Sequence, residues 1–188
     1  ADINYYLATA YKTKGDDVKT MEALEKSLTS KQYGKYACGE LIILCDKHGK
    51  KDLKEKYTQY GYDNYPELSQ YGQWLVVDKI EKQDWDGALK ICEELITRFP
   101  DDKFAYYNKG RVMFEQKKYD EALLCLNEAI DIVELQHSID TKRVSYWEAR
   151  IYEQLSLTYS ALGYHSLALA NRKIYLNLLE AMRQDLEE

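Results

Sequence analysis

The chain has 188 residues, with 26 lysines and arginines against 32 aspartates and glutamates, and a formal net charge of −6. This acidic balance argues against nucleic-acid binding, which needs a basic face. Only 2 prolines and 9 glycines are present, so few residues interrupt helices and the composition favours an all-α protein. No apolar run approaches the length of about 18 residues that a membrane helix needs, so we expect no membrane span.

The first two segments of the chain each predict a pair of helices around a glycine turn. Residues 1–34 place the turn at Gly15, and residues 35–68 place it at Gly49. The second pair departs from the pattern, because Lys54 stands where the other pairs have a small residue. Gly61 and Pro66 predict that its second helix ends early.

The clearest pairs are residues 69–102 and 103–136. Ala88 and Ala122 lie 34 residues apart and are expected where two helices cross closely, since a small side chain lets the backbones approach. Asp120, with its equivalent Asp86, is predicted to cap the second helix of its pair.

The spacing changes after residue 136. The next matching alanine, Ala168, lies 46 residues after Ala122, so the extra residues at about 137–148 are expected to lengthen the neighbouring helices. A last long helix is predicted from His165. Its apolar side chains form a seam with spacings of four, three and four residues: Tyr175, Leu179, Met182 and Leu186. This seam predicts one of two roles for the helix. It either packs on the fifth pair, or it serves as a connector to a downstream domain or as a dimer contact.

A period of 34 residues in helix–turn–helix units resembles the tetratricopeptide repeat (TPR). The resemblance rests on Gly110, Ala122 and Ala129, and in the preceding unit on Leu75, Trp85, Ala88 and Pro100. It implies an all-α, right-handed superhelical solenoid of antiparallel helix hairpins. The chain would form one array over 1–188, with repeats at about 1–34, 35–68, 69–102, 103–148 and 149–182, the second degenerate, and a final helix extending to the C-terminus.

Residues that could carry chemistry do not form a recognisable constellation. The histidines His48, His137 and His165 are far apart in the repeat frame, and there is no glycine-rich phosphate loop or nucleophile motif. The chain is therefore predicted not to be an enzyme and to need no cofactor or metal.

The four cysteines match no zinc-binding spacing: Cys38, Cys45, Cys92 and Cys125. All four fall on predicted helices, where they are expected to act as small core residues. This usage favours a reducing, cytoplasmic compartment. A secreted or periplasmic location stays open, because the sequence starts at Ala1 and the natural N-terminus is not visible.

The resemblance also implies where a partner would bind. In this family the first helices of the repeats line a concave face that holds a peptide or a helix. Carried onto this sequence, the predicted groove consists of Tyr36, Ile43, Trp74, Val77, Phe104, Tyr107, Asn108, Arg111, Phe114 and Arg150. Aromatic side chains are frequent in binding hot spots, although any one of them could instead pack into the core.

Some family members clamp the carboxylate end of chaperones with basic and amide side chains. Asn108 and Arg150 fit two of those positions, whereas Gln73, Val77 and Gln154 do not, so chaperone-tail binding is not predicted. The predicted function is a non-catalytic protein–protein scaffold or adaptor, with self-association through the final helix as a further possibility. The alternative is a regulatory or sensory TPR segment of a larger signalling protein, such as a sensor kinase or transcription regulator.

Overall fold

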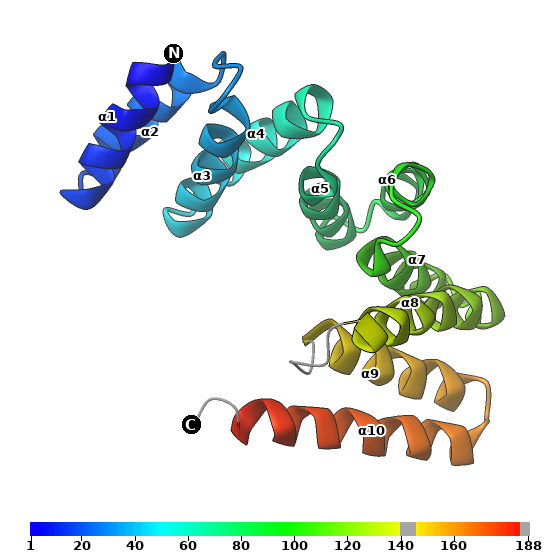
Figure 1. The fold of residues 1–188 in the computed structure, drawn as a ribbon. Helices are drawn as coiled ribbons and strands as arrows, with labels where there is room; N and C mark the ends of the chain where they lie inside the picture. The colour runs from blue at the N-terminus through cyan, green and yellow to red at the C-terminus, as the bar shows by residue number, and fades with distance from the viewer. Residues whose placement is uncertain (140–145, 185–188) are drawn as a thin grey trace. The chain divides into compact units, whose positions relative to one another are not determined.

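The computed structural model describes residues 1–139 and 146–184 (Figure 1). Over these residues the chain forms ten α-helices and no strand, which confirms the predicted all-α class. The helices are α1 Asp2–Thr13, α2 Asp17–Ser27, α3 Gly34–Lys47, α4 Lys51–Asn64, α5 Ser69–Glu81, α6 Trp85–Arg98, α7 Lys103–Glu115, α8 Tyr119–Ile139, α9 Tyr146–Ala161 and α10 His165–Gln184.

One backbone feature recurs in the turn after every odd-numbered helix. A residue with positive φ occurs at Gly15, Gly49, Gln83, Lys117 and Gly163, at separations of 34, 34, 34 and 46 residues. These separations equal the repeat spacings of 34 and 46 residues that the alanine positions of the sequence predict. Two of the five positions hold a side chain that disfavours this conformation, so the turn geometry is kept even where glycine is absent.

The chain divides into two compact units, Ala1–Asp78 and Lys79–Glu188, called unit 1 and unit 2 below. Unit 1 contains α1 to α4 and most of α5, and unit 2 contains the end of α5 and α6 to α10. A single array running across this division stays a prediction.

The core of unit 1 uses a tyrosine where helical repeats commonly use an aliphatic residue. Leu24, Leu41 and Cys38 are fully buried, and the ring of Tyr71 is 3% exposed in the same cluster. Gly61 makes room for that ring, because a Cβ there would lie 2.3 Å from Cδ1 of Tyr71.

This contact corrects the prediction that α4 ends early. The helix continues through Gly61 to Asn64. The glycine therefore serves as a close-approach position inside the helix, and not as its end.

The core of unit 2 lies between α7, α8 and α9. Leu126, Ala129 and Ile151 are fully buried there, with Tyr107 at 2% exposure. Gly110 allows α7 to approach α8, since a Cβ at this position would lie 2.9 Å from Cγ of Leu126.

The predicted cap of α6 is wrong by two residues. The cap of α6 is Asp84, whose Oδ1 accepts from the Gly87 amide at 3.0 Å. Asp86 and Asp120 instead lie inside the first turns of α6 and α8. There a carboxylate is favoured by the partial positive charge of the helix N-terminus.

The last helices are long, as the sequence predicts. Helix α8 has 21 residues and α10 has 20. Residues 140–145 of the predicted lengthened stretch, and Leu186 of the predicted seam, lie outside the described residues. Among the described helices, none combines the length and the apolar character needed to cross a membrane.

Candidate functional site

A groove in unit 1 is lined by three successive first helices, α1, α3 and α5. Its cavity has a volume of about 340 Å³, at the lower end of the range for ligand sites. The lining residues are Tyr5, Lys35, Tyr36, Gly39, Glu40, Ile43, Leu68, Gln70, Tyr71 and Trp74. We call this cavity the unit 1 groove.

The α3 wall of the groove presents apolar side chains to solvent. Tyr36 is 54% exposed and Ile43 is 60% exposed. The two are seven residues apart, so they lie on one face of the helix. The Lys35 ammonium lies over the Tyr36 ring, 5.4 Å from its centroid.

The α1 wall is held in place by a polar network. The Tyr5 hydroxyl donates to Oε1 of Glu40 at 3.1 Å, and Lys12 Nζ lies 2.9 Å from Oε2 of the same carboxylate. Burial and the neighbouring Glu40 charge raise the pKa of Tyr5, so its hydroxyl remains a donor. The Tyr5 ring also stacks on Tyr33, with centroids 4.8 Å apart.

The α5 wall is a pair of aromatic rings. Tyr71 donates its hydroxyl to the Lys35 carbonyl at 2.5 Å, and its ring lies 5.7 Å from that of Trp74, edge to face. Burial raises the pKa of Tyr71, which keeps the hydroxyl protonated. The hydrogen bond ties α5 to α3 and fixes the width of the groove.

Three of the predicted groove residues come together in unit 1: Tyr36, Ile43 and Trp74. Val77, also on α5, is half-buried and does not line this cavity. Sequence reasoning missed Glu40 and Tyr71. Helical spacing could have found both, because Glu40 lies four residues after Tyr36 and Tyr71 lies three residues before Trp74, on the same helix faces.

Three predicted groove residues in unit 2 are buried instead. Phe104 is 7% exposed, Tyr107 2% and Asn108 1%. The rings of Phe104 and Tyr107 lie 5.0 and 5.9 Å from that of Trp147, which begins the next hairpin. These side chains belong to the core of unit 2, so we do not include them in a binding surface.

The remaining predicted residues of unit 2 are Arg111, Phe114 and Arg150, each partly exposed. Arg111 donates through Nη1 to Oδ1 of Asn108 at 3.1 Å, so the buried amide positions the guanidinium. The ring of Phe114 packs on that of Tyr119, with the two ring centroids 5.4 Å apart.

Comparison with known proteins identifies the family. Residues 79–134 match the family model of the tetratricopeptide repeat. A solved structure of MamA protein has a TM-score of 0.70 at 17% identity, covering 97% of this chain and 93% of that one. A tetratricopeptide repeat protein from Parabacteroides merdae has a TM-score of 0.71 at 13% identity, covering 95% of this chain and 66% of that one. Residues 79–134 belong to the tetratricopeptide-repeat (TPR) family, and the chain has a TPR-like fold.

This TPR chain is also similar to a much longer curated protein. Heat shock protein STI1 of Saccharomyces cerevisiae is 29% identical over 116 residues, or 62% of this chain. The chain spans only 18% of that relative's length. The predicted alternative of a regulatory segment in a larger protein is not tested by this match and stays a prediction.

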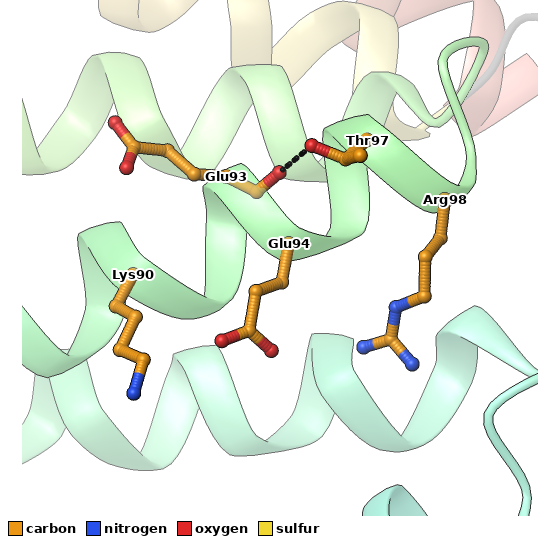
Figure 2. Close-up of a pocket in the computed structure, with 5 residues that line it drawn as sticks. All are labelled: Lys90, Glu93, Glu94, Thr97 and Arg98. Carbon is orange, nitrogen blue, oxygen red and sulfur yellow. Dashed lines mark hydrogen bonds between the residues drawn. The ribbon is translucent and has the colours of Figure 1, made fainter.

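A hollow along α6 offers the TPR chain no comparable site. Figure 2 shows its lining, with Lys90, Glu94 and Arg98 along one side of the helix at spacings of four. Glu93 accepts a hydrogen bond at its backbone carbonyl from Thr97 at 2.8 Å, and its carboxylate pairs with Lys109 at 3.0 Å. Alternating charges at this spacing are typical of a solvated helix face.

Potential metal ligands do not cluster in the part of the chain that the structure describes. No cluster of three or more histidine, cysteine, aspartate or glutamate side chains there could hold an ion. The unit 1 groove therefore remains the main candidate site, and its chemistry is that of apolar contact and hydrogen bonding.

Proposed function

We propose that this TPR chain is a non-catalytic protein-interaction scaffold and that it holds a segment of a polypeptide partner in the unit 1 groove. The TPR fold is generally non-catalytic and serves protein–protein interaction, which supports the coarser part of this proposal. The observation that carries the finer part is the exposure of Tyr36 and Ile43 beside a cavity with rigid walls.

The rigidity of the walls favours binding. The Tyr5–Glu40–Lys12 network and the Tyr71–Lys35 hydrogen bond form without a partner, so little side-chain freedom is lost on association. Tyrosine and tryptophan rings provide a large contact area with few torsions to restrict.

The size of the cavity indicates how the segment would bind. A volume of about 340 Å³ is far smaller than a helix, which has a diameter of about 10–12 Å over several turns. We therefore infer that the partner inserts apolar side chains from a short stretch, while its backbone crosses α3 near Tyr36 and Ile43.

A peptide selection tests the proposal. A random peptide library displayed on phage is selected against the full chain, and the enriched peptides are measured by fluorescence anisotropy. Ile43→Ala and Tyr36→Ala are each expected to weaken binding by about thirtyfold, the effect of truncating a hot spot worth about 2 kcal/mol.

Ile3→Ala is the matched control, because Ile3 is 76% exposed on α1 and does not line the groove. It should leave the affinity unchanged, and all variants should keep the parent helical signal by circular dichroism. Selected peptides that bind Ile43→Ala and Tyr36→Ala as tightly as the parent would rule out the groove.

A further inference from the structure

Three arginines lie on neighbouring helices of unit 2: Arg111 on α7, Arg150 on α9 and Arg172 on α10. Helix α9 packs against both α7 and α10, and Figure 1 shows α9 and α10 running side by side. None of these residues lines the unit 1 groove.

Two of the arginines share a single carboxylate. Arg150 Nη1 lies 2.5 Å from Oε2 of Glu153, and Arg172 Nη1 lies 3.9 Å from its Oε1. Among the described residues, Arg111 has no carboxylate partner; its Nη1 donates to the Asn108 amide oxygen, and its guanidinium carbon lies 5.6 Å from the centroid of the Tyr107 ring. Glu153 thus pairs with two of the three arginines, and the third, Arg111, is held by uncharged groups.

Tyr107 brings Arg111 and Arg150 close together. The ring of Tyr107 lies under Arg111. Burial raises the pKa of Tyr107, and the charges of Arg111 and Arg150 both act on its hydroxyl and offset part of that rise. Two like charges at one buried ring repel each other, and an added anion would offset that repulsion. A guanidinium is suited to this role because it binds carboxylates through two parallel hydrogen bonds.

Exposed leucines flank the arginines. Leu169 is 72% exposed and Leu176 52% exposed, three residues before and four residues after Arg172, so all three lie on one stripe of α10. Leu157 is 47% exposed and lies seven residues after Arg150, on the same face of α9. The surface is therefore both basic and apolar.

We propose that Arg111, Arg150 and Arg172, with these leucines, form a second binding site that takes an acidic segment of a protein partner. We call it the arginine surface. Aspartate or glutamate side chains of the segment pair with the guanidinium groups, and its apolar side chains cover the leucines. The site goes beyond the unit 1 groove and does not depend on it.

Charge favours a protein over a nucleic acid as the ligand. The chain carries a net charge of −6, and Glu153 lies within the arginine surface itself. A phosphate backbone would meet both sources of repulsion along its length, whereas a short acidic segment needs only the three arginines.

The test uses the full chain and a fluorescein-labelled peptide in which glutamates alternate with leucines. The peptide's C-terminus is amidated, so that only side-chain carboxylates are available. In anisotropy titrations, the peptide should bind with an affinity that falls as salt is added. A matched peptide with glutamine in place of glutamate should bind at least about tenfold more weakly.

Charge variants locate the site. Arg111→Gln and Arg172→Gln should each weaken binding by about tenfold, whereas Arg98→Gln, which removes an arginine from α6, should not. Glu153→Gln removes the competing carboxylate and should strengthen binding by about fivefold. This gain separates a binding role from a structural one, because a damaged fold does not bind more tightly.

Several results would overturn the proposal. These are equal affinity for the two peptides, an Arg98→Gln loss as large as that of Arg111→Gln, or weaker binding by Glu153→Gln. Tighter binding of a DNA duplex than of the acidic peptide would assign the surface to nucleic acid. Self-association in sedimentation runs that Arg111→Gln abolishes would assign it to a second copy of the chain. Ile43→Ala should leave peptide binding here unchanged, so the outcome is independent of the unit 1 groove.

Discussion

At the scale of single residues, the buried Tyr71 and the half-buried Tyr65 of unit 1 each depend on a specific neighbour. Tyr71 packs where a Cβ on Gly61 would stand, and Tyr65 donates its hydroxyl to the Leu28 carbonyl at 3.1 Å. A tyrosine ring is larger than a leucine side chain and carries a hydroxyl that must be satisfied when buried. The glycine supplies the space and the backbone carbonyl supplies the acceptor.

Gly61→Ala should therefore destabilise the chain. Its Cβ would lie 2.3 Å from a ring carbon that cannot easily move, because Tyr71 is buried and hydrogen-bonded to Lys35. Overpacking of this kind costs about 1–3 kcal/mol, measurable as a lower denaturant midpoint. Gly39→Ala is the control, since its Cβ would lie 3.7 Å from the Tyr71 hydroxyl, an ordinary contact. An equal loss in both variants would contradict this account of Gly61.

At the scale of helices and turns, a residue with positive φ sets the direction in which the chain leaves each odd-numbered helix and enters the next one. Gly163 adopts φ of 80° and Lys117 φ of 62° at equivalent places in their turns. A residue with a Cβ pays about 1–2 kcal/mol in this conformation. Helix packing on either side of the turn compensates for that cost at Lys117.

Lys117→Gly should raise the stability of the chain by about 0.5–1 kcal/mol, because it removes the strain while adding some unfolded-state entropy. Gly163→Ala makes the reverse change and should lower stability by about 1 kcal/mol, since no atom lies within 4 Å of the added Cβ and only the backbone conformation opposes it. Both are measured by urea titration. A loss of stability in Lys117→Gly would show that the lysine side chain contributes more than the strain costs.

At the scale of the whole molecule, each unit holds two free cysteines among its helices, and all except the half-buried Cys125 are fully buried. Cys38 and Cys45 belong to unit 1, and Cys92 and Cys125 to unit 2. Burial raises the pKa of Cys38 to about 11 and that of Cys92 to about 12, and it also raises those of Cys45 and Cys125. The thiols therefore report on the integrity of both cores.

In the native chain at a pH near 8, Cys38 and Cys92 should each react with a thiol reagent at least about a hundredfold more slowly than in the unfolded chain, Cys92 the more slowly of the two. The reason is that the reactive thiolate forms near pH 8.5 in an unfolded chain but only at much higher pH in the core. Mass spectrometry of labelled peptides measures each site, with urea-unfolded chain as the control. Rapid native labelling of Cys92 would mean that unit 2 opens far more readily than its burial indicates.

The candidate sites were only partly predictable from the sequence. The family resemblance, carried onto the first helices, implies that Tyr36, Ile43 and Trp74 share one groove, and all three line the unit 1 groove. The resemblance also implies groove positions for Phe104 and Tyr107, which Trp147 of the next hairpin covers. Spacing within a helix carries no information about which neighbour lies above it.

The sequence by itself determined the helical class and the recurring turn, because both depend on local properties: apolar spacing, small residues at helix crossings and the scarcity of residues that break helices. Only the tertiary structure decided that Gly61 lies inside α4, that Asn108 is a buried support for Arg111, and that Arg150 and Arg172 share a single carboxylate. These features depend on packing between helices that are separate in the chain. That packing buries Gly61 and Asn108, and it brings Arg172 of α10 to Glu153 of α9. Whether a side chain is buried, and which charges surround it at the surface, depends on how several helices pack together. The sequence of any one helix does not specify this.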